Sequence, residues 1–501
     1  MPSSPRNGES FFLPAERAQG LANYPHARIV PGSQKTLYVS GTSSRRGDGT
    51  YAGCTTDADG NHILNVREQT KAVLENIGSI IQGATNGTAG LESVVDATVF
   101  LTDMKDYAGM NEEWNKVWPE KTKAPARTCV QVAALPNVQT RRHGWALTLH
   151  WVLDALERTI GKERAAKLQK AVVDSSLKKD AGNFLFLNAE TCETRYKIPP
   201  SKRRLRLHRQ KLRDVLTDGL NIQEGKDLVR VEEIEGGVRA HFQDGTSVDG
   251  TILIGADGNN SNVRKFLMPE HHELNRLPVH LVGVVRHFTP EQAAPVRALD
   301  PLLFQALHPK TQNYLWYSVQ ECFTEPDGRL SFDCLVIISW IMKDPVSDAI
   351  PKTNPERIAK MKERAKEFAE PLRSIVMDIP DDMDYTTPLR LGDFPCRDWD
   401  NRNGRVTLAG DAAHAMTMYR GEGANHGILD AALLVDELKR IHKGEIDQKA
   451  AINLYEAEMR PRTHEAVLKS RAAALVAHEW DQITIDSPIV GARTAPLTAF
   501  K

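Results

Sequence analysis

Two short apolar runs, each followed at once by a glycine-rich loop, constrain the fold of this chain most strongly. Thr251–Ile254 ends at Gly255, and Arg405–Ala409 ends at Gly410. Short apolar runs bounded in this way are typical of strands buried in a parallel sheet. Because ligands of open α/β sheets lie beyond the carboxyl ends of the strands, we expect both loops to face one crevice.

The second loop and the segment after it are suited to a flat, polar ligand. Asp411 directly follows the strand and is placed to accept hydrogen bonds from sugar or ribityl hydroxyls. Gly421, Gly423 and Ala424 carry little or no side chain, so the backbone there can approach a ring closely. N–H groups opening the helix predicted from His426 would stabilise negative charge on that ring.

The rest of the second half predicts further α/β structure. A helix is expected near 208–220, hairpin turns at Gly236-Gly237 and Asp244-Gly245, and long helices from 426 to about 478. Several strand-like runs between 280 and 342 predict a substrate-side sheet.

The N-terminal part has a different pattern. Asn65 and Glu68 form a capping-box signature before an apolar helical repeat. Strands predicted over 36–40, 94–101 and 127–133 alternate with this helix and with a second over 105–118, which gives a small α+β unit. We therefore expect domains over 1–138 and 139–480, and a loose tail over 481–501.

Three segments in order then carry a family resemblance. Leu207–Leu212, Gly255–Arg264 and Gly410–Asn425 resemble motifs of the FAD-dependent aromatic hydroxylases, the group of salicylate hydroxylase, within a region spanning roughly 141–478. The resemblance implies an α/β FAD-binding region. The residues that it assigns to the cofactor site are Arg209, Asp257, Gly410, Asp411, Gly423, Ala424 and Asn425.

The roles implied by the resemblance differ along the cofactor. Arg209 and Asp411 would bind FAD, whereas Gly423 to Asn425 would lie against the isoalloxazine ring, and Asp257 near the pyrophosphate and the approach of the nicotinamide. The family reduces FAD with NAD(P)H and transfers one oxygen atom of O2 to an electron-rich ring. The implied substrate is a small aromatic or polyketide-like molecule.

The segment with which members of this family usually begin is missing from the sequence. Relatives open with a strand and a Gly-x-Gly-x-x-Gly loop at a helix N-terminus, which binds the pyrophosphate. The spacing of Gly41, Gly47 and Gly49 does not match, and the glycines at 83, 87 and 90 follow a helix instead of opening one. The sequence therefore predicts an incomplete Rossmann-type sheet. Met418 also replaces a proline that many relatives carry.

The first 138 residues carry a second resemblance. Asn23–Arg28, Leu37–Arg46, Ala97–Asp103 and Pro125–Val130 resemble the RidA family, and most closely its 2-aminomuconate deaminase branch. The resemblance implies a trimer with sites between subunits, where Arg127 holds a carboxylate while water attacks an enamine or imine. It stops before the family's closing strand, which bears a functional glutamate.

The charge balance and the cysteine spacing restrict the binding partners that we expect for this chain. Lys+Arg 64 against Asp+Glu 65 leaves a net charge of −1, so no global field attracts nucleic acid or an anionic membrane. Six cysteines lack C-x-x-C spacing, which argues against a metal site and favours reduced thiols in the cytoplasm. Three interpretations stay open: an active monooxygenase, a RidA-type deaminase with a vestigial flavin region, and a non-catalytic or mis-joined product.

Overall fold

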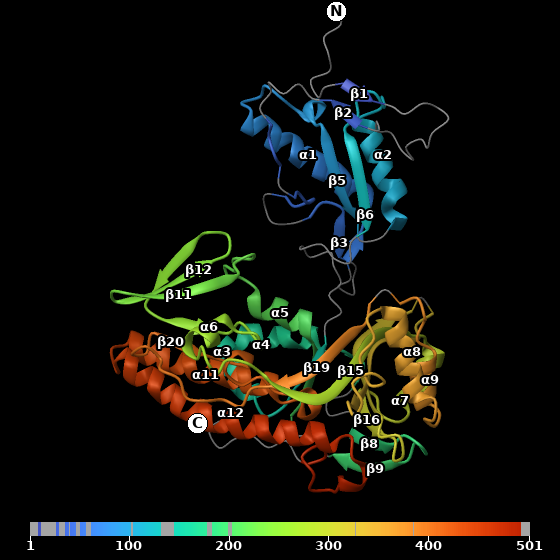
Figure 1. Cartoon of the computed structure of the whole chain (residues 1–501), viewed down its shortest axis with the longest axis vertical. Coiled ribbons are helices and arrows are strands. Elements are labelled where there is room, and N and C mark those ends of the chain that lie inside the picture. The colour runs from blue at the N-terminus through green and yellow to red at the C-terminus, as the bar shows by residue number, and fades with distance from the viewer. Residues whose placement is uncertain are drawn as a thin grey trace, which may run out of the picture. The chain divides into compact units, whose positions relative to one another are not determined.

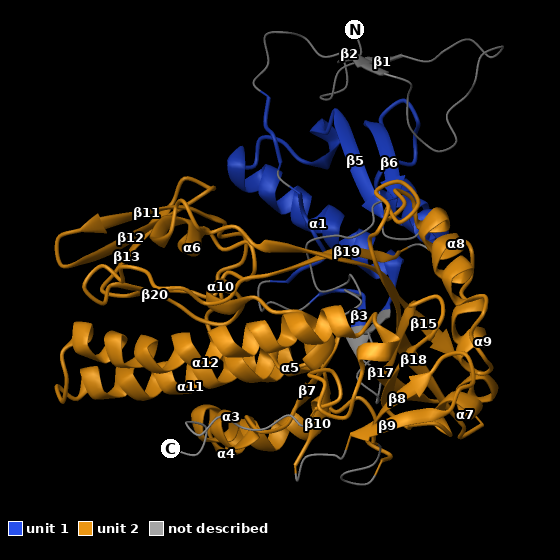
Figure 2. Ribbon diagram, turned by 60° about the horizontal axis from the view of Figure 1, so that its bottom comes forward, with its two compact units in different colours: residues 1–142 blue, residues 143–501 orange. Residues whose placement is uncertain are grey.

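The chain divides into two compact units, residues 1–142 and 143–501, in a computed structural model (Figure 2). The structure describes residues 9–11, 27–29, 36–39, 41–46, 51–56, 62–101, 104–131, 145–177, 183–198, 203–325, 327–383 and 385–491. Each unit has hydrophobic core residues of its own.

Unit 1 is the small α+β unit that the sequence predicts (Figure 1). Its elements are β1 (Glu9–Phe11), β2 (Ala27–Ile29), β3 (Cys54–Thr56), β4 (His62–Leu64), α1 (Val66–Ala84), η1 (Leu91–Ser93), β5 (Asp96–Leu101), η2 (Met104–Asp106), α2 (Tyr107–Val117) and β6 (Ala126–Gln131). Strands β5 and β6 pair in parallel, while β1 pairs with β2 and β3 with β4 antiparallel.

The local signals of unit 1 act largely as expected. The Asn65 side chain caps α1 by accepting from the N–H groups of Arg67 and Glu68. Leu74 of α1 and Trp114 of α2 lie in the same buried cluster. The strand predicted over 36–40 was wrong for residues 36–39, which have no regular secondary structure. Tyr38 there is 90% exposed, so the segment has no packed face to hold it in a sheet.

The first part of unit 2 includes two strands of its largest sheet, β8 (Phe184–Asn188) and β9 (Thr194–Ile198). The elements of this part are β7 (Ala146–Leu149), α3 (Leu153–Ile160), α4 (Lys162–Ala166), η3 (Lys167–Ala171), β8, β9, β10 (Leu205–His208), α5 (Arg209–Thr217), β11 (Leu228–Ile234), β12 (Gly237–Phe242), β13 (Ser247–Gly250), β14 (Leu253–Gly255) and α6 (Asn262–Leu267). Both predicted hairpin turns are present, since β11, β12 and β13 form one antiparallel sheet.

The remaining elements complete the largest sheet and form the long helices. They are β15 (Asn275–Phe288), α7 (Pro290–Arg297), β16 (Leu303–Leu307), β17 (Tyr314–Thr324), β18 (Leu330–Ile341), α8 (Asn354–Ala365), α9 (Leu372–Met377), β19 (Thr387–Asp393), β20 (Val406–Leu408), α10 (Asp411–His414), η4 (Met418–Arg420), α11 (Gly423–His442), α12 (Gln448–Val476) and η5 (Trp480–Gln482).

Three arrangements position the site. A seven-stranded sheet has the order β19-β15-β18-β17-β16-β8-β9, which confirms the sheet predicted from 280 to 342. Helices α11 and α12 run side by side (Figure 2). Strands β14 and β20 pair in parallel, with Leu253 opposite Val406 and Gly255 opposite Leu408. Within the described residues neither strand has a second neighbour, and Ile254 of β14 remains 37% exposed.

The predicted loose tail is wrong for the residues up to 491. Ile483, Ile489 and Val490 are buried in a core cluster that includes the inner face of the seven-stranded sheet and residues of α12. Their apolar side chains leave water, which holds the segment on unit 2 although its sequence carries no strong helix or strand pattern. No helix in the described part of the chain is both long and apolar enough to cross a bilayer.

Shortening Ile489 to valine therefore tests this packing. We expect Ile489→Val to lower the free energy of unfolding by about 1 kcal/mol, because a buried methylene is lost. The matched control is Ile485→Val, since Ile485 is 60% exposed and should change nothing measurable. Equal urea midpoints for both variants would show that the segment is not packed in solution.

Candidate functional site

Arg264 joins the two strand-end loops. It lies in the short helix α6 and is almost fully buried. Its Nη1 donates to the carbonyl oxygens of Asp411 (3.3 Å) and Ala412 (2.9 Å), and its Nε donates to that of His272 (2.8 Å). Nη2 donates to the carbonyl of Asn259, and the guanidinium lies 4.5 Å from the ring centre of Phe394. One side chain thus holds both loops at the ends of β14 and β20.

The Asp257 side chain accepts hydrogen bonds within the first loop and at the start of α6. Its carboxylate accepts from the N–H groups of Asn262 (2.7 Å) and Val263 (3.2 Å) and from the hydroxyl of Ser261. These groups lie at the start of α6, so the carboxylate satisfies donors that have no partner within the helix. The structure gives Asp257 a capping role, while the predicted contact with the cofactor stays a prediction.

Asp411 is the carboxylate that the second loop presents. It opens α10 and is exposed to solvent. Burial by surrounding protein raises the pKa of its carboxyl, while the charges of His414, Arg209 and Arg264 act in the opposite direction. Arg209, the exposed first residue of α5, is therefore close enough to interact with Asp411 electrostatically. These two predicted residues therefore lie within electrostatic range of each other.

The start of α11 lies beside Asp411. A Cβ atom added to Gly423 would be 4.0 Å from Asp411 Oδ1, and 3.4 Å from the Met416 side chain. Gly423, Ala424 and Asn425 form the first turn of the helix, whose N–H groups lack intrahelical acceptors. A side chain at position 423 would fill the space in front of the carboxylate, so glycine keeps this approach open.

The Asn425 side chain has a structural task. Its Oδ1 accepts from His150 N (3.1 Å), and its Nδ2 donates to Thr148 O (3.0 Å). The residue is fully buried and ties the start of α11 to β7. Its side chain is thus engaged within the protein, and the predicted ring contact, which would use the backbone N–H, stays a prediction.

Gly410 has the backbone conformation that its residue type allows. Its φ is +60°, in the region that favours glycine, and its N–H donates to Asp430 Oδ2 (2.9 Å). Asp430 is buried in α11 and also accepts from His414. Gly410 therefore contributes to the turn after β20 through its backbone, by its positive φ and its hydrogen bond to Asp430.

In unit 1, Arg127 is buried against α2 of its own chain. Its Nη2 donates to Asn111 Oδ1 (2.6 Å), and the guanidinium lies 4.6 Å from the ring centre of Trp114. Burial raises the pKa of the neighbouring Cys129 thiol, which disfavours the nucleophilic thiolate. The Arg127 guanidinium is thus held on β6 by groups of its own chain, and its anion-binding role stays a prediction.

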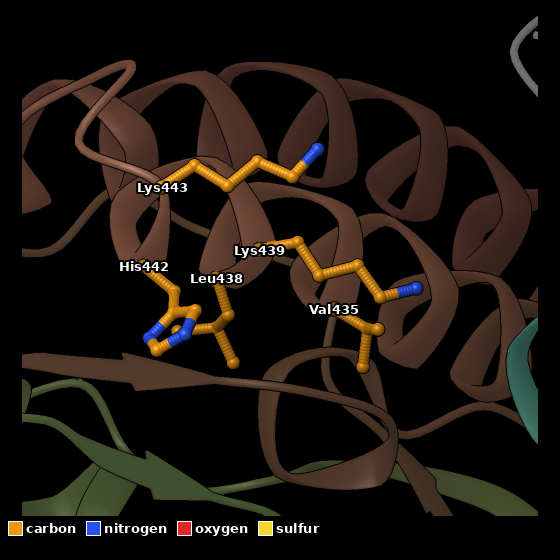
Figure 3. A pocket seen from close by; sticks show the side chains of 5 residues that line it. All are labelled: Val435, Leu438, Lys439, His442 and Lys443. Carbon is orange, nitrogen blue, oxygen red and sulfur yellow. The ribbon is translucent and has the colours of Figure 1, made fainter.

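The pocket shown in Figure 3 lies apart from these residues. It has a volume of about 320 Å³ and is lined by Val435, Leu438, Lys439, His442 and Lys443 near the end of α11. None of the predicted site residues lines it. Among the described residues, no group of three or more histidine, cysteine, aspartate or glutamate side chains is placed to hold a metal ion.

Comparison with known proteins identifies unit 2. The family model described as FAD binding domain matches residues 202–470. A protein of Arthroderma benhamiae named probable FAD-dependent monooxygenase is 38% identical over 382 residues, which cover 72% of this chain and 88% of the relative. The chain belongs to the FAD-dependent monooxygenases. FAD is therefore the cofactor of this monooxygenase, as the three ordered motifs predict.

Two further comparisons agree with this assignment. The FAD-dependent monooxygenase dbaB of Emericella nidulans is 44% identical to the monooxygenase over 299 residues, which cover 58% of this chain and 75% of the relative. A salicylate hydroxylase substrate complex has a TM-score of 0.52 and 18% identity, and the match covers 77% of this chain and 90% of that one. At this identity the likeness shows a shared fold.

Unit 1 matches a different family. The model described as Endoribonuclease L-PSP matches residues 16–140, which confirms a RidA-family domain at the start of the monooxygenase. The two family matches do not overlap, since the second begins at residue 202.

Sequence reasoning missed two residues that hold the site together. Arg264 was seen only as the end of a motif, and Asp430 only as one position in a long helix. The signal for Arg264 was its position three residues before Leu267, which places both on the buried side of α6. An aspartate within an otherwise apolar stretch of α11 was the signal for Asp430.

Proposed function

We propose that the monooxygenase hydroxylates a small aromatic or polyketide-like ring, with NADH or NADPH as the reductant. One atom of O2 replaces a ring hydrogen as a hydroxyl group, and the other leaves as water. NAD(P)H supplies two electrons and one proton as a hydride, and the second proton comes from solvent. The convergence of Asp411, Arg209 and the α11 N-terminus at the ends of β14 and β20 carries this proposal. The shared fold with salicylate hydroxylase supports the aromatic substrate.

The residues present fit the flavin and ribityl part of FAD. The accessible Asp411 carboxylate is an acceptor for ribityl hydroxyls, and Arg209 supplies a cation beside it. The first turn of α11, from Gly423 to Asn425, offers N–H groups to a ring that gains negative charge. FAD, when bound, supplies the two-electron chemistry and the reaction with O2. Asp257 would lie toward the pyrophosphate.

Turnover by the full chain tests the reaction. FAD-loaded protein should oxidise NADH or NADPH faster when a phenol from a small panel is present, and mass spectrometry should find a product heavier by one oxygen atom. Incorporation of label from isotopically enriched O2 would separate oxygenation from hydrolysis. If the nucleotide is oxidised without any hydroxylated product across the panel, the aromatic assignment loses its support.

A second activity is favoured by the RidA-family domain. We infer that unit 1, with a domain boundary near residue 138, hydrolyses enamines or imines in a trimer, and that Arg127 holds the substrate carboxylate through its planar guanidinium. Ring oxidation can generate reactive enamines, so the two activities are chemically compatible. Six free cysteines support a reducing compartment, the cytoplasm, as the place of action.

Replacing Arg127 by glutamine tests this inference. We expect Arg127→Gln to lower imine hydrolysis by at least about tenfold, because the carboxylate loses a charged, bidentate partner. The measurement is ammonia release from an imino acid generated in the assay, with the exposed Arg67→Gln as control. Unchanged ammonia release in Arg127→Gln would remove Arg127 from the site.

A further inference from the structure

Asp430 is a buried carboxylate at the back of the turn that carries Asp411. It lies in α11 and has no exposure to solvent. Its Oδ2 accepts from Gly410 N (2.9 Å) and from His414 Nε2 (2.5 Å), and its Oδ1 accepts from Arg462 Nη2 (2.7 Å). Three donors from two other segments thus converge on one carboxylate.

The charge of Asp430 is stabilised by a network on α12. Arg462 also donates through Nε to Glu458 (2.9 Å), and its Nη1 lies 2.8 Å from His426 Nδ1. Burial alone raises the pKa of Asp430, but the charges and hydrogen bonds of His414 and Arg462 outweigh it, so the pKa is lowered. The carboxylate is therefore ionised, which gives its hydrogen bonds the strength of charged ones.

These contacts hold both ends of a single turn. Gly410 precedes α10 and His414 ends it, and Asp411 is the residue directly after Gly410. The turn also packs closely on α11, since a Cβ atom on Gly427 would lie 3.4 Å from Gly410 Cα. With both ends fixed to Asp430, the backbone at Asp411 has little freedom to rotate.

We propose that Asp430 is a positioning residue of the cofactor site, whose carboxylate fixes the turn from Gly410 to His414 and so directs Asp411. The inference rests on the proposed contact between Asp411 and FAD. Asp430 acts through the turn, since it is enclosed by protein and faces Gly410, His414 and Arg462.

Glu456 provides a matched control for the loss of a buried carboxylate. It is also buried on the long helices of unit 2, and it accepts from Trp399 Nε1 (2.9 Å), Thr407 Oγ1 (2.8 Å) and Arg460 Nη2 (2.6 Å). None of these partners belongs to the turn. Asp430→Asn and Glu456→Gln should therefore both lower the melting temperature, while only the first should disturb Asp411.

The affinity of the full chain for FAD tests the proposal. Titration followed by flavin fluorescence should show about tenfold weaker binding for Asp430→Asn and less than about twofold for Glu456→Gln. In an Asp411→Ala background, Asp430→Asn should have no further effect, because the residue through which it acts is gone. Equal effects in both backgrounds would overturn the positioning role, and so would unchanged affinity in Asp430→Asn.

Amide hydrogen exchange gives a readout that needs no cofactor. Asp430→Asn should speed exchange of the amides from Gly410 to His414 at least about tenfold, whereas Glu456→Gln should leave them unchanged. His414→Gln, which keeps the Asp430–Arg462 ion pair, should do the same to a smaller extent if Asp430→Asn does not fold. A wild-type chain that binds no FAD would contradict the proposed function alone, while unchanged exchange in both turn variants would contradict this inference.

Discussion

Replacing Asp411 by asparagine is expected to weaken FAD binding by about ten- to a hundredfold. A hydrogen bond to an ionised group contributes roughly 1.5–3 kcal/mol, and every 1.4 kcal/mol is about tenfold in affinity. Asp411 is exposed and faces the start of α11, so the loss falls on ligand contacts rather than on packing. The measurement is a fluorescence titration of the full chain with FAD.

The raised pKa of Asp411 also predicts how FAD affinity changes with pH. Although Asp411 keeps solvent-accessible surface, the protein around it partly desolvates its carboxyl and raises the pKa, so the carboxyl takes up its proton at a higher pH than an ordinary aspartate. FAD affinity of the wild type should therefore fall as the pH is lowered through that raised pKa, while Asp411→Asn should not follow this profile. Asp436→Asn, on the exposed side of α11, is the control and should match the wild type. Wild-type affinity in Asp411→Asn would exclude Asp411 from the site.

Replacing Arg264 by methionine is expected to lower the free energy of unfolding by about 3 kcal/mol. Methionine keeps much of the apolar volume but leaves the carbonyl oxygens of Asn259, His272 and Ala412 without their donor, at roughly 1 kcal/mol or more each. The contact to the ring of Phe394 also loses its charge. Urea unfolding of the full chain measures the change.

The control for Arg264 is an arginine that does not join the two loops. Arg230 is largely exposed on β11, and Arg230→Met should shift unfolding by less than about 0.5 kcal/mol. Arg264→Met should also weaken FAD binding, because the loops after β14 and β20 lose their link. If both variants unfold alike, the two loops are held together by other contacts.

Much of the fold followed from local signals. The short apolar run before Gly410 predicted a buried strand, and the start of α1 followed from Asn65 and Glu68. The packed segment from 483 to 491 was not predictable, because Ile483, Ile489 and Val490 are too irregularly spaced to indicate a helix or a strand. Its structure depends on a core surface formed by distant residues.

Part of the site was also predictable from local sequence motifs. Asp411 and Gly423 stand in motifs whose spacing already suggests a ligand, and the structure brings them together. The side-chain partners of Asn425 and Asp257 could not be predicted, because each bonds to backbone groups whose position depends on the fold. Likewise, the role of Asp430 depends on Arg462, which is 32 residues away.

The absence of a Gly-x-Gly-x-x-Gly loop from the sequence makes cofactor binding the decisive property. Strands β14 and β20 pair only with each other in the described residues, and without that loop the diphosphate of FAD would lack the helix N-terminus that the family's usual beginning supplies. We expect the full chain, incubated with FAD and then desalted, to retain one FAD per chain by its visible spectrum. A colourless protein that retains no FAD even after incubation with excess cofactor would contradict it.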